Sequence, residues 1–257
     1  MGEKIRAKIR YSSLIISKEM RLFSYCIPVD DGAAPNPYWG ICTLTICKPV
    51  IRRTAEVGDW IIGVGSKRMK RSKGGSYEKR LVYAMKVTEI MSLEEYDKFC
   101  TRKLSKKIPD LESKDYRRQV GDCQYDYSDE YASQRPGVHS RKNRAKDLRG
   151  ENSLLSKHFY YFGNKAEKIP FRFWELCRQG QGHQLQKNDK VKEAFVKWLT
   201  NKFEKNKLYG EPQIKLDFSK RGNSKYCSIK RCEEADQDEK IYKKGKSHLS
   251  IKVLNRN

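Results

Sequence analysis

The chain has 257 residues, of which 37% are hydrophobic, 11% aromatic and 34% charged. This composition is sufficient for a hydrophobic core, because aromatic side chains bury large areas, and the length allows one large domain or one domain with an extension. Lys and Arg number 55 against 32 Asp and Glu, a formal net charge of +23. Such a charge is typical of proteins that bind a polyanion, with nucleic acid as the first expectation and simple solubility as the alternative.

No apolar run is long enough to cross a bilayer, and no charged-then-apolar leader opens the chain, so we expect a cytoplasmic protein without a membrane partner. The eight cysteines then indicate free thiols in a reducing compartment. Cys42 and Cys47, like Cys227 and Cys232, have four residues between them, which is not a paired Cys-x-x-Cys framework. We therefore expect no metal and no cofactor, and we expect Cys42 and Cys47 to pack as small hydrophobic side chains.

Strand-length apolar runs occupy residues 22–29, 41–46 and 60–64, after a predicted edge strand at residues 11–16. The loop of residues 30–40 contains Asp-Asp-Gly and Pro-Asn-Pro turns, which predicts a fixed loop between two neighbouring strands, a common place for a site. A basic loop with two glycines follows at residues 67–80, and residues 81–90 alternate as a further strand. Ser92 with Glu95 three residues later predicts a capped helix through residue 99.

Residues 101–150 are polar and have no sustained period, which predicts a functional insertion or a mobile lid. A strand at residues 154–162 and a short helix at residues 170–179 follow, and then an amphipathic helix capped by Asp189. Residues 213–218, 225–230 and 249–254 have the alternation of strands in a basic tail. We therefore expect a main domain in residues 1–208 and a basic extension packed on it in residues 209–257.

Several motifs in the first third of the chain resemble a known family. They are Phe23-Ser24-Tyr25, Asp31-Gly32-x-Ala34-Pro35-Asn36-Pro37, Cys42-Thr43-Leu44-x-x-Cys47-Lys48-Pro49 and Gly58-Asp59-Trp60, with weaker matches as far as Gly182-His183. Over about residues 20–185 the chain resembles the nucleotide modification associated domain 2 family, a bacterial and phage family proposed to work alongside DNA base modification. The family carries an Asp-Asn-x-Tyr pattern near Asp122 and Tyr125, and this sequence departs from it with Cys123.

The order of elements between residues 22 and 99 also resembles the PUA-like class of small twisted barrels, which includes the EVE and ASCH domains. This resemblance implies an α/β (α+β) fold with a PUA-like β-barrel core, helical insertions and a basic, β-rich C-terminal extension. It further implies a pocket that holds a modified or flipped base by stacking and by hydrogen bonds to its edge.

The residues expected in that pocket have rings on which a base can stack, or amide and hydroxyl groups that can form hydrogen bonds to the edge of a base. They are Tyr25, Pro35, Asn36, Trp39, Trp60, Ser66 and Tyr160. The alternative is a purely structural role, in which Trp60 and Tyr25 are aromatic residues of the core and Asn36 is a turn residue. The basic residues expected to bind phosphate are Lys48, Arg52, Arg53, Lys67, Arg68, Lys70, Arg71 and Lys73. Since neighbouring residues of a strand face opposite ways, only one of Arg52 and Arg53 should point at the pocket.

His183 is the best candidate for a catalytic residue, because a histidine beside glycines can approach a ligand and titrates near neutrality. The alternative is a histidine that only forms hydrogen bonds. If the chain is an enzyme, which is not the first expectation, Asp31 and Tyr125 would join His183 in the site. The chain has no nucleoside-triphosphate loop and no dinucleotide fingerprint. The first functional expectation is recognition of a modified base in a bacterial or phage DNA modification or defence system, with DNA rather than RNA, or a modified nucleotide, as the partner. The alternatives are a transferase or hydrolase acting on a modified base or nucleotide, and a nuclease-like effector. The oligomeric state stays open.

Overall fold

The structure is a computed structural model that describes residues 19–219 except residues 73, 179 and 181. The fold is α+β and its largest element is a seven-stranded sheet with the order β11-β1-β3-β4-β9-β12, in which β10 pairs with β4. These strands are β1 (Leu22–Ile27), β3 (Trp60–Gly65), β4 (Arg80–Lys86), β9 (Phe159–Tyr161), β10 (Glu167–Lys168), β11 (His183–Leu185) and β12 (Lys207–Leu208). Most neighbours are antiparallel, but β1 runs parallel to β3, and β12 runs parallel to β9.

A second sheet of three antiparallel strands has the order β2-β8-β5, and a short hairpin joins β6 to β7. These strands are β2 (Cys42–Leu44), β5 (Glu89–Ser92), β6 (Tyr125–Asp126), β7 (Ser133–Gln134) and β8 (Asn152–Ser156). The α-helices are α1 (Pro49–Thr54), α2 (Leu93–Lys103), α3 (Tyr116–Gln119), α4 (Arg144–Leu148) and α5 (Asp189–Lys202), and 3₁₀ turns occupy Ser105–Lys107, Arg141–Asn143, Gly163–Lys165 and Phe171–Leu176.

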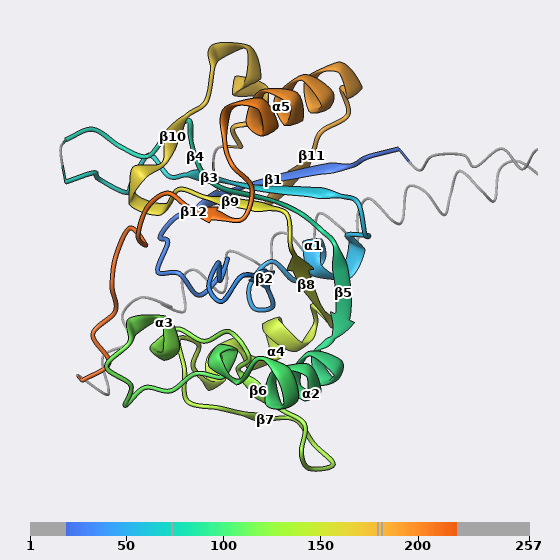
Figure 1. The fold of residues 1–257 in the computed structure, drawn as a ribbon, viewed down its shortest axis with the longest axis vertical. Coiled ribbons are helices and arrows are strands. Elements are labelled where there is room, and N and C mark those ends of the chain that lie inside the picture. Colours follow the sequence, from blue (N-terminus) through green and yellow to red (C-terminus); the bar gives the residue numbers. More distant parts are fainter. Residues whose placement is uncertain (1–18, 73, 179, 181, 220–257) are drawn as a thin grey trace, which may run out of the picture.

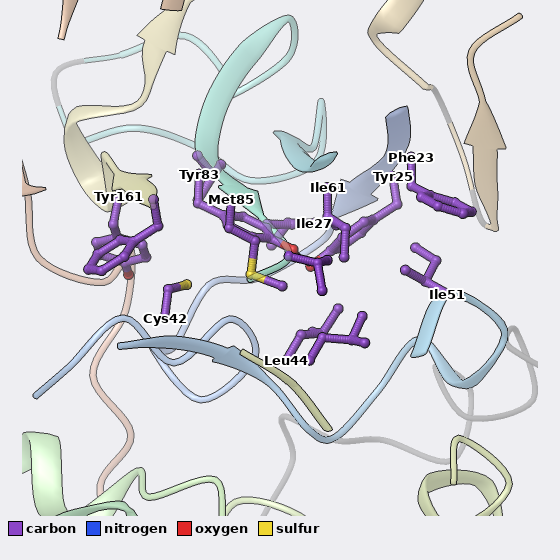
Figure 2. Close-up of a cluster of buried hydrophobic side chains, with 14 of the residues drawn as sticks. Phe23, Tyr25, Ile27, Cys42, Leu44, Ile51, Ile61, Tyr83, Met85 and Tyr161 are labelled. Carbon is purple, nitrogen blue, oxygen red and sulfur yellow. The ribbon is translucent and has the colours of Figure 1, made fainter. Parts of the chain in front are cut away.

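The large sheet is buried on both faces, which explains why β3 is a continuous apolar run rather than an alternating one. Helix α5 covers one face, and the second sheet, with α1, lies on the other (Figure 1). Ile62 of β3 packs toward α5, whereas Ile61 belongs to the core between the two sheets. In Figure 2 the side chains of Tyr25, Met85 and others point from the large sheet toward those of the second sheet and α1, and this core fixes the position of α1 below the sheet.

The insertion at residues 101–150 is ordered and forms a further layer against the second sheet (Figure 1). Helix α2, which leads into the insertion, begins with the capping box of Ser92 and Glu95 that the sequence predicts. Val120 and Tyr125 of the insertion share one apolar cluster with Ile46 and Tyr38. The loop of residues 30–40 is thereby held against the insertion.

The structure corrects several expectations about the fold. Among the described strands β11 and β12 are edges, so the large sheet does not close into the predicted barrel. The predicted neighbours β1 and β2 lie in different sheets, because β1 pairs with β3 and β2 pairs with β8. The single strand expected at residues 154–162 is divided into β8 and β9, which belong to different sheets.

Other corrections concern helices and the tail. Arg52 and Arg53 lie in helix α1 and not in a strand. The side chain that caps α5 is that of Asn188, which precedes Asp189. Residues 213–218 form no strand, and the expected strands at residues 11–16, 225–230 and 249–254 lie outside the described residues. Within the described residues, no helix has the length and apolar character needed to cross a membrane.

Candidate active site

Cys47 lies at the turn between strand β2 and helix α1, with its side chain partly exposed. The backbone of this turn is unusual, because Cys47 has φ 60° and Lys48 has φ 39°, two consecutive left-handed residues that are not glycine. Residues other than glycine adopt this conformation at a cost, and such strain is concentrated at functional sites. The fixed ring of Pro49 then starts helix α1, whose Ile51 is anchored in the core between the sheets.

The insertion contributes His139 and Asp147, which lie next to Cys47 in space although they are distant from it in the sequence. The Cys47 Sγ atom lies 3.3 Å from His139 Nε2, and His139 Nδ1 lies 2.5 Å from Asp147 Oδ2. His139 is held through its backbone, because its N–H donates to the Gln124 side chain and its carbonyl accepts from that of Gln134. The result is a thiol, an imidazole and a carboxylate in line, which is the order of a Cys-His-Asp catalytic triad.

Asp147 is fully buried, and each of its oxygens has a donor. Oδ1 accepts the backbone N–H of Cys47 at 3.0 Å, and Oδ2 also accepts the Tyr125 hydroxyl at 2.9 Å. Burial disfavours the carboxylate, but His139, Arg52 and the Cys47 amide more than offset this effect and hold the pKa of Asp147 below its ordinary value. Asp147 is therefore ionised at neutral pH and can orient the imidazole with its Nδ1–H toward the carboxylate.

Arg52 supports this arrangement from the interior of the chain. Its side chain is fully buried and donates to the carbonyl oxygens of Asn152 at 2.7 Å, Asp147 at 2.9 Å and Cys47 at 3.3 Å. One guanidinium thus links helix α1, helix α4 and strand β8, the elements around the triad. Arg52 is a positioning residue, and the phosphate-binding role expected for it is incompatible with this burial.

A second buried polar cluster ties the loop of residues 30–40 to the insertion. Lys107 Nζ donates to Asn36 Oδ1 at 2.7 Å, and Asn36 Nδ2 donates to the Val120 carbonyl at 2.9 Å. Asp122 accepts hydrogen bonds from the Thr43 hydroxyl at 2.5 Å and from the Tyr96 hydroxyl at 2.9 Å. Burial lowers the pKa of Lys107, and the charge of Asp122 opposes that effect. The hydrogen-bonding groups of Asn36 are therefore used inside the fold.

The structure does not bring the predicted base-binding residues together. Tyr25 faces the core between the sheets, whereas Trp60 and Tyr160 stack on each other in the core under α5. Pro35 and Ser66 are also buried. Trp39 is the partly exposed member of the set, with Lys106 Nζ 4.9 Å and Arg117 Cζ 4.6 Å from its ring centroid. These aromatics do not border one cavity, because the large sheet separates Tyr25 from Trp60.

The predicted catalytic residues are also dispersed. Tyr125 is beside the triad through its bond to Asp147, whereas Asp31 accepts the Ala33 amide in the loop of residues 30–40. His183 is on edge strand β11, in register with Tyr25, and its ring lies 5.9 Å from that of Phe23. His139, and not His183, is the histidine whose ring contacts both Cys47 and Asp147.

The predicted phosphate-binding residues differ in exposure. Lys67, Arg68 and Lys70 are exposed on the basic loop and Arg71 is partly exposed, whereas Lys73 lies outside the described residues. Arg53 donates to the Arg149 carbonyl at 2.5 Å. Lys48 places Nζ 4.7 Å from the centroid of the Tyr25 ring, next to the turn that carries Cys47.

Sequence reasoning missed the triad because Cys47 and His139 are 92 positions apart and the packing of the insertion joins them. The expectation that Cys47 packs as a small hydrophobic side chain is wrong, since its sulfur contacts a histidine and is partly exposed. Two signals were available, a cysteine directly before a Lys-Pro helix start and a polar insertion with its own His and Asp. Among the residues that the structure describes, the six cysteines have free thiols and no group of three or more His, Cys, Asp or Glu side chains is arranged to hold a metal ion.

Comparison with known proteins gives one family. The sequence model described as nucleotide modification associated domain 2 matches residues 19–220, which include all three triad residues and the whole insertion. Comparison with curated proteins and with solved structures gives no match. Since the match covers most of the chain, the chain belongs to the nucleotide modification associated domain 2 family.

Proposed function

We propose that the chain is a cysteine-dependent transferase or hydrolase that acts on an acyl group carried by a nucleotide or a modified base. The observation that carries this proposal is the alignment of Cys47 Sγ, His139 Nε2 and Asp147 at 3.3 Å and 2.5 Å. A thiol needs a base to become a strong nucleophile, and the base needs a group that orients it. This chain supplies both, and the thiol is partly exposed.

The reaction follows from the positions of the three side chains. His139 Nε2 takes the proton from Cys47 Sγ, and the thiolate attacks the acyl carbon to form an S–C bond. The bond between that carbon and its leaving group breaks, and the leaving group receives the proton from His139. Water or an acceptor then loses a proton to His139 and displaces the sulfur, which regains its proton. Asp147 stabilises the imidazolium at each transfer without itself taking the proton.

The family description, nucleotide modification associated domain 2, supports a nucleotide-linked substrate. The bacterial or phage modification or defence setting is part of the proposal. The net charge of +23 supports the same substrate class, because phosphates bind cationic surfaces. The exposed basic loop with Lys67, Arg68 and Lys70 is a suitable contact for a nucleic-acid backbone.

Recognition of a modified base without catalysis is the second candidate function. It is favoured by an open hollow of ≈ 660 Å³ next to helix α5, lined by Arg172, Lys197, Trp198 and Lys202 among others. An aromatic face among cations is typical of surfaces that bind single-stranded nucleic acid. Lys202 also pairs with Glu167 at 2.9 Å, which reduces the positive charge of this hollow.

The two candidates are separated by incubating the protein with nucleotides and oligonucleotides that carry acylated bases. Mass spectrometry of the nucleosides and of the intact protein should show a changed nucleoside or an adduct on the Cys47 peptide, and Cys47→Ser should abolish both. The matched control is Cys26→Ser, which removes another partly exposed thiol and should change neither. If the protein binds the oligonucleotides but leaves every nucleoside unchanged, forms no adduct and shows no difference between the variants, the result would support modified-base recognition and overturn the proposed enzyme activity.

A further inference from the structure

An exposed aromatic ring lies next to the open hollow at helix α5. Phe171 is 79% exposed, more than any other large hydrophobic side chain that the structure describes. It begins the 3₁₀ turn Phe171–Leu176, and the next residue, Arg172, lines the hollow. The ring contacts that of Trp174, with 4.9 Å between centroids and 65° between planes. A single exposed hydrophobic side chain needs no explanation, but this one adjoins a hollow lined by cations.

Buried rings fix the 3₁₀ turn on helix α5. Phe173 of the turn is buried, and its ring centroid lies 5.6 Å from that of Phe195 and 5.9 Å from that of Trp198. Trp198 packs against this core, lines the hollow and keeps part of its surface exposed. Arg172 Cζ lies 4.8 Å from the centroid of the Phe173 ring. The groups around the hollow are therefore held in place before a ligand binds, which reduces the entropy lost on binding.

The lining of the hollow is positively charged. Arg172, Lys197 and Lys202 belong to it, and none of the described residues that line it is acidic. Lys202 pairs with Glu167 at 2.9 Å, whereas Arg172 and Lys197 form no ion pair with another residue that the structure describes. Glu193 precedes Lys197 by one turn of α5, but no ion pair joins the two. The charges of Arg172 and Lys197 are therefore available to an anion.

The basic loop of residues 67–80 reaches the same 3₁₀ turn. Lys79, near the end of this loop, places Nζ 3.5 Å from the centroid of the Trp174 ring. The Trp174 ring also contacts that of Phe171, so this end of the basic loop lies close to the exposed ring. A ligand that extends from the hollow along the turn therefore meets further positive charge.

The chemistry of this face selects its occupant. Aromatic rings among unpaired cations suit a ligand that has both flat apolar faces and a chain of negative charges, and a single-stranded nucleic acid has both. A duplex presents its phosphates but keeps the faces of its bases stacked inside. The exposed Phe171 ring would have no base to contact on a duplex.

Other occupants fit less well. The segments outside the described range, residues 1–18 and 220–257, each contain more Lys and Arg than Asp and Glu, so their charge opposes binding to a cationic hollow. A membrane surface is bound through a large apolar face. The apolar stripe of α5 is packed in the core under the large sheet, which leaves the face without that area.

We propose that the face formed by Phe171, Arg172, Lys197 and Trp198 binds single-stranded nucleic acid, with the two rings stacked on bases and the two cations bound to phosphates. Every base has a flat face, so this binding needs no modified base and goes beyond both functions proposed above. Helix α5 and the turn that carries Cys47 lie on opposite faces of the large sheet (Figure 1). The surface is therefore separate from the thiol site.

The test measures the affinity of the full chain for a fluorescent oligothymidylate of about 12 nucleotides, a length within the usual site sizes of single-strand binding modules, by fluorescence anisotropy at low salt. Phe171→Ala should weaken binding by about fivefold to a hundredfold, the effect of losing one ring that stacks on a base. Tyr131→Ala is the matched control, because it removes a ring that is 75% exposed on the insertion, and it should keep the wild-type affinity. Circular dichroism checks that both variants are folded. Equal affinity of Phe171→Ala and the wild type would overturn the proposal, as would a wild type that does not bind.

The charged half of the face is tested by the salt dependence of the same binding. Lys197→Glu should reduce the slope of log affinity against log salt concentration by about 0.7, the loss of one phosphate contact on a single strand. Lys142→Glu makes the same change at an exposed position of the insertion and should keep the wild-type slope. An unchanged slope in Lys197→Glu, or an equal reduction in Lys142→Glu, would contradict a phosphate contact at the hollow.

Further ligands identify the partner. A DNA hairpin should bind the wild type and Phe171→Ala equally, and an oligouridylate that binds more tightly than the oligothymidylate would assign the strand to RNA. If Phe171→Ala weakens the hairpin as much as the single strand, the face does not select single strands and the proposal fails. Vesicles of anionic phospholipid that bind the wild type but not Phe171→Ala, with oligothymidylate binding unchanged, would assign the face to a membrane instead. None of these measurements involves the thiol, so they stand whether or not Cys47 is reactive.

Discussion

Asp30 is a fully buried carboxyl group outside the triad, and its titration should affect the stability of the folded chain. Its Oδ2 accepts the Tyr161 hydroxyl at 2.7 Å, and its Oδ1 accepts the Gly32 amide at 3.2 Å. Burial raises its pKa to about 7, although these hydrogen bonds oppose the shift. In the unfolded chain the group loses its proton near pH 3.8, the ordinary value.

Between about pH 4 and pH 7 the folded state therefore binds one more proton than the unfolded state at Asp30. The free energy of unfolding should fall as pH rises through this window, by up to about 1.4 kcal/mol per pH unit from this group, and level off above pH 7. Denaturant unfolding of Asp30→Asn should show a smaller fall over the same window, whereas Asp129→Asn, at an exposed position, should keep the wild-type slope. A parallel pH profile for Asp30→Asn and the wild type would contradict the shifted pKa.

At the scale of single residues, the sequence predicts local features better than sites. The capping box of Ser92 and Glu95 depends on residues three apart, and it forms as expected. The flat ring of Trp60 and the amide of Asn36 are both suited to binding a base. In the fold, Trp60 packs in a hydrophobic core, and Asn36 accepts a hydrogen bond from Lys107 in a buried polar network. Residue type alone cannot distinguish base binding from structural packing, because the burial of a side chain depends on segments that are distant in the sequence.

At the scale of elements, Gly150, just after helix α4, lies close to the Arg52 side chain of helix α1. A Cβ atom at Gly150 would lie 2.3 Å from Arg52 Cζ, and the guanidinium cannot move because it is buried and bonded to carbonyls of three segments. Gly150→Ala should therefore lower the free energy of unfolding by about 1–3 kcal/mol. It should also slow alkylation of Cys47, since Arg52 holds the Cys47 carbonyl.

The control for Gly150→Ala is Lys142→Ala, a substitution at an exposed position of the same insertion that should leave both quantities unchanged. Urea unfolding gives the stability and peptide mass spectrometry gives the alkylation rate. If Gly150→Ala is as stable as the wild type, Arg52 has room to move and is not the rigid link between these helices.

The elements that the sequence predicts correctly are those specified by a local pattern. Strands β1, β3 and β4 are apolar runs and helix α5 has an apolar stripe, so their types follow from periodicity. Pairing does not follow in the same way, because β2 joins β8 across more than a hundred residues and leaves β1 without the expected neighbour. The barrel expected from the order of elements fails for this reason. The lack of a period in the insertion predicts a functional insertion or a mobile lid. The structure shows that it is folded and that it brings His139 and Asp147 together, and its function stays a prediction.

At the scale of the whole molecule, the net charge of +23 predicts salt-sensitive binding to nucleic acid. Affinity for a DNA duplex should fall linearly with salt on logarithmic axes. A triple variant with Lys67, Arg68 and Lys70 changed to Glu should reduce the slope by up to about 3, near one per phosphate contact. Binding that is unchanged by salt would remove nucleic acid as the partner, and an unchanged slope in the variant would place the contact elsewhere.

The central claim is that His139 and Asp147 activate the Cys47 thiol, and its most direct test is the rate at which iodoacetamide alkylates Cys47 at pH 7, resolved peptide by peptide. In the wild type Cys47 should react at least about tenfold faster than Cys26, which is also partly exposed but has its pKa raised by burial. His139→Gln and Asp147→Asn should each slow Cys47 by about tenfold or more and leave Cys26 unchanged, with circular dichroism confirming that both variants are folded. A Cys47 that reacts at the rate of Cys26, or at the same rate in folded His139→Gln as in the wild type, would contradict the account.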